Sequence, residues 1–254
     1  MRSPSSCSPA GAAGALAAIG LAFAGSGCAA LEPEYGASAP VVSRYVFRGV
    51  VLNSEPALQP EAFVSAEEGE RTWLAGVWTN FDLTDENGQE GELTEVDLYG
   101  EVARSFGDVR VALGLTQYRP VQPKASSTIE AYLIASSVLE SFTPALELYY
   151  DVDEAEGLYA NLSVSRGFTP AEAWDLTLTG GVGWMSAGQS DYSFGVDQSG
   201  LSDFLLQAAV EHPLGERAML GITTAFSSVI DSDLRDAVSD PENLVIGISL
   251  GWTF

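Results

Sequence analysis

Charged side chains recur at every second or fourth position in several segments that are otherwise apolar. Arg44 and Arg48 are four residues apart, and Glu95, Asp97 and Glu101 follow the same even spacing. Because successive side chains of a β-strand point to opposite faces, each set shares one face of its strand. Carboxylates and guanidinium groups placed in this way can pair with one another, or attract and sort charged solutes. The full set of such residues is Arg44, Arg48, Glu61, Glu95, Asp97, Glu101, Arg110, Glu130, Glu147 and Asp151.

Residues for covalent or metal catalysis are sparse. His212 is the sole histidine, and it stands beside Pro213 in an expected short turn. A Ser/His hydrolase would need its histidine beside a serine and a carboxamide, at the end of the strands opposite to these short turns. The sequence has no zinc-like His/Cys set and no Gly-rich phosphate loop, so we expect no enzyme, no cofactor and no metal. The acidic stretches 82–92 and 231–242 could hold Ca²⁺, but they lack the ligand order of a calcium loop.

The elements that carry these charges have the composition of β-strands. Short segments rich in Val, Leu, Thr, Tyr and Trp alternate with Gly, Asp, Asn and Pro, and the part that follows the leader has no apolar run of the roughly 20 residues that a membrane helix needs. The formal net charge of −24 argues against nucleic-acid binding. The segments predict about twelve strands: 41–53, 57–67, 71–83, 93–105, 109–119, 128–139, 144–152, 157–167, 174–186, 202–212, 218–229 and 243–254.

The connections between these segments alternate in length. Short gaps lie at 68–70, 106–108, 140–143 and 213–217, whereas the intervening gaps include the long segments 84–92, 119–127, 187–201 and 230–242. Short turns on one side and long loops on the other are typical of outer-membrane barrels. The final segment adds a terminal Phe with apolar residues at every second position, which resembles the outer-membrane insertion signature. Its residues are Phe254, Trp252, Leu250, Ile248 and Ile246.

These observations predict an all-β fold, a transmembrane antiparallel up-and-down barrel of about twelve strands in the bacterial outer membrane. A soluble β-sandwich also alternates and is the architectural rival. Arginine facing lipid near the midplane costs about 2–4 kcal/mol, so we expect the charged set to line the lumen. Neighbouring strands would then bring Glu61 near Arg44 and Arg48, with Tyr45 and Phe47 on the opposite face of their strand. Arg110 is expected beside Asp97 and Glu101.

The N-terminal segment predicts export. Arg2 supplies a positive region, residues 11–25 are apolar, and small residues surround Cys28. We expect a signal peptide over 1–30, a linker over 31–40 and the barrel over 41–254. Residues 25–28 partly resemble a lipobox, so Cys28 is a candidate for lipidation, with ordinary cleavage near Ala29 or Ala30 as the alternative. Both cysteines lie in this segment, which leaves no disulfide for the barrel.

Several short motifs resemble the TorF-type porins, a family of bacterial outer-membrane barrels. The motifs are 41–50 (VVSRYVFRGV), 57–60 (ALQP), 75–80 (AGVWTN), 95–100 (EVDLYG), 149–151 (YYD) and 157–159 (GLY). The family usually has a small residue after the tryptophan, where this chain has Thr79, and the C-terminal third matches only in pattern. The resemblance implies a membrane barrel of porin type and does not specify a solute.

Three functions are compatible with these features. The first is passive or weakly selective passage of small solutes through the charged lumen. The second is an occluded structural or surface-interaction barrel, in which the same charges fill the interior as salt bridges. The third, a lipid-modifying enzyme, would depend on His212. Expected partners are outer-membrane lipid and lipopolysaccharide, the outer-membrane assembly machinery and small solutes.

Overall fold

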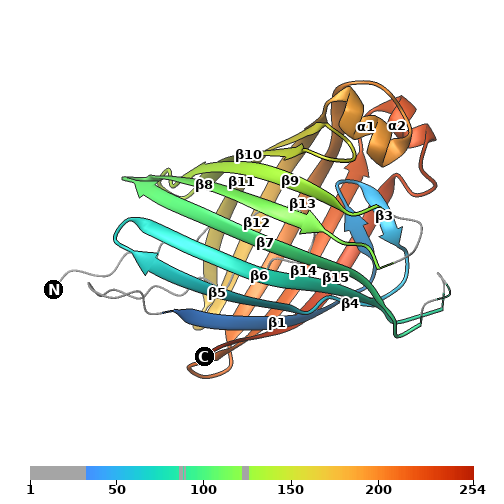
Figure 1. Ribbon diagram of the computed structural model, residues 1–254. Coiled ribbons are helices and arrows are strands. Elements are labelled where there is room, and N and C mark those ends of the chain that lie inside the picture. The colour runs from blue at the N-terminus through green and yellow to red at the C-terminus, as the bar shows by residue number, and fades with distance from the viewer. Residues whose placement is uncertain (1–32, 86–87, 89, 122–125) are drawn as a thin grey trace.

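A closed antiparallel β-barrel forms the body of the protein (Figure 1). The computed structural model describes residues 33–85, 88, 90–121 and 126–254. The wall consists of β1 (Glu34–Val42), β4 (Ala57–Leu58), β5 (Glu61–Glu68), β6 (Arg71–Asp82), β7 (Leu93–Phe106), β8 (Val109–Tyr118), β9 (Thr128–Ser137), β10 (Thr143–Asp151), β11 (Leu158–Ala171), β12 (Trp174–Met185), β13 (Gly200–Pro213), β14 (Ala218–Val229) and β15 (Glu242–Thr253). Because β4 and β5 together occupy one place between β1 and β6, the wall has twelve strand positions. Pairing of β1 with β15 closes the ring, and the predicted fold class is confirmed.

The two ends of the barrel differ as the connection lengths predict. Turns of a few residues join β5 to β6, β7 to β8 and β13 to β14. The opposite end carries the long connections, including the helices α1 (Ala187–Phe194) and α2 (Ser232–Asp236). The C-terminus lies at the short-turn end, away from both helices (Figure 1). In the described residues, neither helix has the length and apolar content that crossing a membrane requires.

The outer surface of the wall is apolar and the inner surface is polar. In β15, residues 244 to 252 with even numbers are exposed on the outside, and those with odd numbers from 243 to 253 are buried on the inside. Exposed leucines such as Leu113, Leu115 and Leu162 continue the apolar surface around the barrel. A closed sheet of this kind leaves no unpaired edge in hydrocarbon. The chain is therefore an outer-membrane β-barrel.

The first predicted strand was wrong. Residues 34–40, expected to be a linker, form most of β1, and the expected strand 41–53 is split. The chain leaves the wall after Val42, and β2 (Tyr45–Phe47) pairs with β3 (Val50–Asn53) as a separate hairpin. The segment EYGASAPVV has few β-branched or aromatic residues, so its composition does not indicate a strand. It is a strand because it pairs with β15 on one side and β5 on the other.

Aromatic side chains on the inner wall lie flat over glycines of neighbouring strands. A Cβ atom added to Gly76 would overlap the ring of Tyr99, and one added to Gly114 would overlap the ring of Tyr132. Asp203 and the ring of Tyr159 together cover Gly183. The glycines thus let bulky rings lie against the wall, which leaves the hydroxyl groups to meet polar partners in the lumen.

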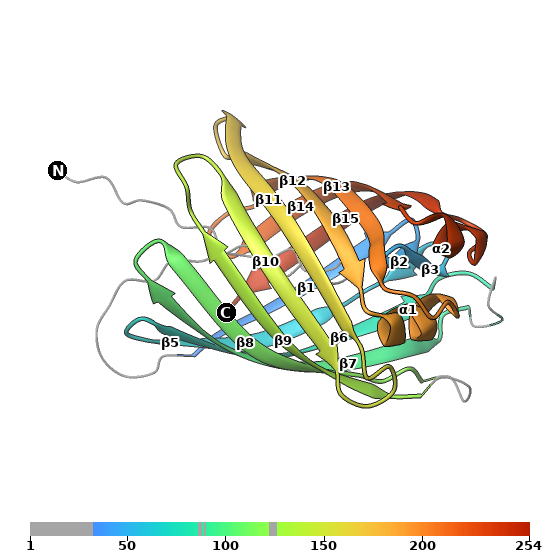
Figure 2. The ribbon, with the colours of Figure 1, turned by 90° about the horizontal axis from the view of Figure 1, so that it is seen from above.

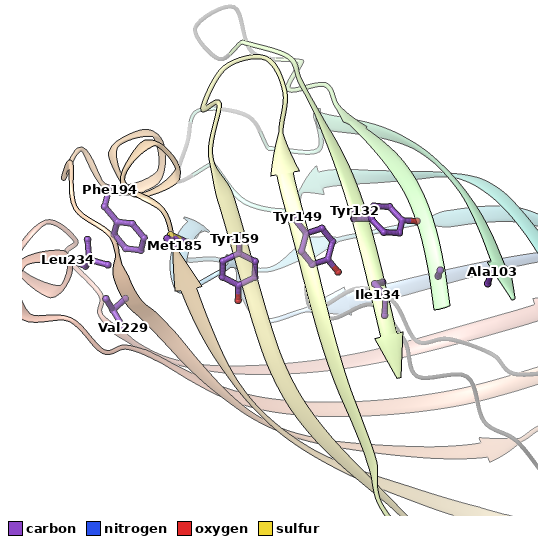
Figure 3. Packing of buried hydrophobic residues seen from close by; sticks show 10 residues of the cluster. Ala103, Tyr132, Ile134, Tyr149, Tyr159, Met185, Phe194, Val229 and Leu234 are labelled. Atoms are coloured by element: carbon purple, nitrogen blue, oxygen red, sulfur yellow. The ribbon is translucent and has the colours of Figure 1, made fainter. Parts of the chain in front are cut away.

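At the long-connection end, a small apolar cluster packs the two helices against the ends of the strands. Phe194 of α1 and Leu234 of α2 pack with Met185 and Val229 at the ends of strands (Figure 3). The side chain of Asp231 accepts hydrogen bonds from the first backbone N–H groups of α2 and so caps that helix. This cluster fixes the rim beside which the β2–β3 hairpin enters the barrel.

Candidate functional site

The β2–β3 hairpin crosses the lumen from one wall to the opposite one. It begins directly after β1, whose neighbours in the sheet are β15 and β5. At its start, Arg44 donates a 2.7 Å hydrogen bond to Asn243 of β15. Its tip contacts β9, β10 and β11, which lie about halfway around the ring from β1. Figure 2 shows the hairpin between the wall of β13–β15 and the wall of β6 and β7.

A two-residue turn at Arg48 and Gly49 forms the tip. Phe47 pairs with Val50 across it, and both turn residues have positive φ, 49° for Arg48 and 85° for Gly49. Two consecutive positive φ values are typical of a type I′ turn, which suits the twist of a hairpin. Glycine meets that requirement without strain, but arginine does not. The surroundings must therefore hold Arg48 in place.

Those surroundings are a carboxylate and three aromatic rings. Arg48 donates from both terminal nitrogens to the two oxygens of Glu130 on β9, at 2.6 and 2.8 Å. Its guanidinium carbon lies 4.3 Å from the ring centre of Tyr159, 4.8 Å from that of Tyr149 and 4.6 Å from that of Phe47. The paired side chains of Arg48 and Glu130 are each only 3% exposed.

The guanidinium of Arg48 keeps its positive charge despite its burial. Burial alone lowers the pKa of Arg48, but the adjacent Glu130 carboxylate outweighs that effect and raises it above its ordinary value. The guanidinium is therefore positively charged at physiological pH. Its Nε atom is buried and has no hydrogen-bond partner among the described residues, so the tip is held on one edge of the guanidinium and on its faces.

The rest of the hairpin is anchored by apolar and aromatic contacts. Tyr45 packs against Trp78 of β6 with ring centres 5.5 Å apart and donates a 3.1 Å hydrogen bond to Glu95 of β7. Phe47 meets the ring of Tyr118 edge-on at 5.8 Å. On the other side, the buried Val46 belongs to a cluster with Val42, Ala57 and Val245. Tyr45 and Phe47 thus face the lumen wall and not the lipid, contrary to the expectation from strand parity.

Pairs of a tyrosine with a carboxylate line the lumen wall beside the hairpin. Tyr99 donates to Glu61 at 2.5 Å, Tyr118 to Glu130 at 3.0 Å, Tyr132 to Glu101 at 3.2 Å, Tyr149 to Glu147 at 2.9 Å and Tyr159 to Asp203 at 3.4 Å. Figure 3 shows Tyr132, Tyr149 and Tyr159 in a row on three neighbouring strands. The phenol groups stabilise carboxylates that few cations accompany.

The predicted ion pairs are partly wrong. Arg110 and Glu101 form the expected pair at 2.6 Å. Glu61 does not approach Arg44 or Arg48, because those arginines left the wall with the hairpin, and Glu61 contacts Tyr99 instead. Asp97 does not pair with Arg110. It accepts a 3.2 Å hydrogen bond from the backbone N–H of residue 119.

Two further predicted residues have local partners. Glu147 is buried and accepts hydrogen bonds from Tyr149 and, at 3.4 Å, from Asn161. Asp151 accepts from the hydroxyl of Thr128 at 2.7 Å and from the backbone N–H of Ala155, so it organises the connection between β10 and β11. This aspartate positions a loop.

Sequence reasoning missed the tyrosines and Asp203. Tyr149 and Tyr159 share the inward parity of Glu147 and Asn161, which is the pattern that could have marked them. No sequence pattern identifies Glu130 as the partner of Arg48, because the two residues are 82 positions apart in the chain. Only the crossing of the lumen brings the two together.

The remaining predicted positions lie away from the hairpin. His212 hydrogen-bonds through Nδ1 to the carbonyl oxygen of Ala173 at 2.8 Å, and its ring stacks on Trp174 at 4.4 Å near the short turns. On the outer surface of the closing strand, Trp252 and Phe254 are exposed. Cys28 and the predicted signal peptide 1–30 lie outside the described residues.

Several solved structures that resemble this barrel are named as porins or outer-membrane channels. The COG4313 outer membrane channel from Pseudomonas putida F1 matches with a TM-score of 0.54 and 8% identity, over 89% of this chain and 97% of that one. The NanC porin matches with a TM-score of 0.51 and 11% identity, over 86% and 98%. The KdgM porin in complex with disordered oligogalacturonate matches with a TM-score of 0.50 and 7% identity, over 87% and 99%. At these identities the similarity shows the fold alone.

Sequence comparison gives a family. A search of the curated proteins found no match to this sequence. A family model described as "Bacterial protein of unknown function (Gcw_chp)" matches residues 29–210, which is more than half of the chain and includes the hairpin and the tyrosine–carboxylate wall. The chain, a porin-like barrel with a charged hairpin across its lumen, therefore belongs to the Gcw_chp family.

Proposed function

We propose that the barrel gives passive, weakly selective passage to small solutes, and that the β2–β3 hairpin forms the narrowest part of the path. The observation that carries this proposal is the position of the hairpin, which spans the lumen between β15 and β9 through Arg44 and Arg48. A solute that travels along the barrel must pass beside it. The resemblance to TorF-type porins agrees with this function.

The charges of the wall favour cations over anions. Three carboxylates, those of Glu61, Glu95 and Asp97, form no ion pair with arginine among the described residues. The two lumenal arginines that do form ion pairs, Arg48 and Arg110, are matched by Glu130 and Glu101. A negatively charged path with low-dielectric walls attracts cations. A polyanion such as the oligogalacturonate named for the KdgM porin would be disfavoured here.

The measurement is the conductance of purified, folded protein in a planar lipid bilayer. We expect discrete current steps and, in a KCl gradient, a reversal potential that shows preference for K⁺ over Cl⁻. Replacing Glu95 and Asp97 with Gln and Asn should reduce that preference without unfolding the barrel. A chloride preference of the unmodified protein would contradict the proposed role of the carboxylates.

The occluded barrel is the second candidate, and the burial of the hairpin favours it. Tyr45, Val46 and Arg48 are all less than a tenth exposed, so the hairpin is packed against the wall on several sides. If the folded protein, verified by its heat-dependent mobility in gel electrophoresis, gives no current steps, the occluded barrel is the better description. A variant without residues 45–53 that conducts would then identify the hairpin as the plug.

Delivery to the membrane is also inferred. Residues 1–30 would direct export, and Cys28 would be either lipidated or removed with that segment. The outer-membrane assembly machinery would recognise the closing strand through the alternate apolar residues that end in Trp252 and Phe254. Lipopolysaccharide would meet the acidic long connections through divalent cations. Mass spectrometry of the protein from membranes would distinguish the two fates of Cys28.

A further inference from the structure

We propose that the wall around Glu130 is a binding site for guanidinium-bearing solutes, and that Arg48 occupies it as a built-in substitute for the ligand. The inference rests on the proposed passage function and names a class of solute for it. The site consists of the Glu130 carboxylate and the rings of Tyr149 and Tyr159. Each of these groups belongs to the wall, whereas the guanidinium they hold belongs to the hairpin.

The contacts of Arg48 are those by which a protein recognises a free guanidinium. The planar group forms two parallel hydrogen bonds of 2.6 and 2.8 Å with one carboxylate, a geometry that an ammonium cannot reproduce. Two tyrosine rings of the wall lie within 5 Å of its carbon atom and provide cation–π attraction. Tyr118 orients the carboxylate with a 3.0 Å hydrogen bond to one of its oxygens.

The wall part of the site does not depend on the hairpin for its own structure. Glu130 on β9, Tyr149 on β10 and Tyr159 on β11 come from three consecutive strands that are paired along their length. Tyr149 and Tyr159 are further fixed by hydrogen bonds to Glu147 and Asp203. Withdrawal of Arg48 would therefore leave a formed anionic site between aromatic rings.

The hairpin holds its arginine under conditions that favour exchange. Arg48 has a left-handed backbone conformation, with φ of 49°, which is unfavourable for a side chain with a Cβ atom. Its Nε atom is buried without a hydrogen-bond partner among the described residues. A small solute that reaches the wall without this backbone constraint can orient all of its donors. Solutes with a guanidinium group would thus compete with the hairpin tip as they pass.

The test empties the site and offers it a small guanidinium. In R48G the turn keeps a residue suited to positive φ, and the site loses its occupant. We compare full-length R48G, folded in detergent, with the unmodified protein and with the double variant R48G/E130Q. R48G should bind ethylguanidinium at least about tenfold more tightly than either, because a tenfold difference in affinity corresponds to the free energy that a charged hydrogen-bonded pair contributes. Calorimetry measures this binding. Ethylammonium, which cannot form two parallel bonds, should bind R48G more weakly than ethylguanidinium.

Two outcomes overturn the inference: equal ethylguanidinium affinity of R48G and R48G/E130Q, or stronger binding of ethylammonium than of ethylguanidinium by R48G. If R48G does not give the folded, heat-modifiable band, R48N replaces it, because Asn also tolerates a left-handed backbone. Calorimetry in detergent does not require conductance. A barrel that binds ethylguanidinium but passes no current would contradict the passage function, whereas one that conducts without binding would contradict only the guanidinium site.

Discussion

Removing the partner of the hairpin tip should release the hairpin from the opposite wall. In E130Q, the buried guanidinium of Arg48 would lose the carboxylate that balances its charge and one of two acceptor oxygens, at 2.6 and 2.8 Å. Its Nε atom already has no hydrogen-bond partner among the described residues, so the loss is not compensated within the hairpin. The amide that replaces the carboxylate would keep a single acceptor oxygen.

The expected size of the effect follows from the burial of the pair. Both side chains are only 3% exposed, which places the pair among buried ion pairs. Breaking such a pair by removing one partner costs about 3–5 kcal/mol. With one acceptor retained, we take the lower figure of about 3 kcal/mol, which corresponds to roughly a hundredfold increase in the undocked fraction.

A cysteine in the hairpin reports undocking. Val46 is 4% exposed because it packs against Val42, Ala57 and Val245, on the side of the hairpin away from Glu130. It is paired with Val51 within the short hairpin, so a V46C thiol should react with a water-soluble reagent only when release of the tip lets the whole hairpin move. Cys7 and Cys28 are replaced by Ser in this background. We expect E130Q to accelerate labelling about a hundredfold. E101Q is the matched control, because Glu101 also pairs with an arginine at 2.6 Å but does not contact the hairpin, and it should leave the rate unchanged.

Equal labelling rates in E130Q and in its parent would refute the reasoning, since the ion pair would then not hold the tip. Equal acceleration by E101Q would also refute it, because the effect would come from lumenal charge in general. The heat-dependent gel mobility of each variant excludes labelling of unfolded chains.

Three further predictions use the same folded-barrel assays. G49A should speed labelling of the hairpin cysteine about tenfold, because an added Cβ meets the wall at 3.2 Å and the φ of 85° disfavours alanine; an unchanged rate would show that the turn tolerates another geometry. G114A should lower the folded yield, because the added Cβ would overlap the ring of Tyr132. G167A is the control and should fold normally, because a Cβ at that position meets no atom within 4 Å. Similar folded yields of the two variants would contradict the proposed packing. Burial raises the pKa of Tyr45 well above its usual range, so its contribution to docking is present below pH 10 and is lost as the pH rises further. Because thiol reactivity itself rises with pH, each labelling rate is divided by that of a small free thiol at the same pH. A normalised rate that rises already between pH 7 and 9 would argue against this contribution.

Much of the wall could be predicted from the sequence. The alternation in the closing segment requires an apolar face and a polar face, and connections of alternating length require one end with turns and one with loops. The inward positions of Glu101 and Arg110 follow from the cost of placing charge in lipid. These features are local or periodic, so they can be identified without knowing which strand neighbours which.

The start of the barrel could not be predicted in this way. The strand Glu34–Val42 has the composition of a linker, and it is a strand only because ring closure provides hydrogen-bonding partners on both sides. The predicted strand 41–53 alternates like a wall strand, but only Val41 and Val42 belong to the wall, and residues 45–53 form a hairpin inside the barrel. The dipeptide Arg48-Gly49 was the available sign, because glycine between two alternating runs indicates a turn.

The candidate site was determined by the tertiary structure. The sequence by itself established that Arg48 and Glu130 belong in a polar interior, because lipid excludes both. Their pairing depends on a hairpin that leaves one wall and reaches the wall halfway around the ring, across 82 residues of chain. No periodicity encodes that contact, since it arises from the closure of the barrel and from the length of the hairpin that must fit across it.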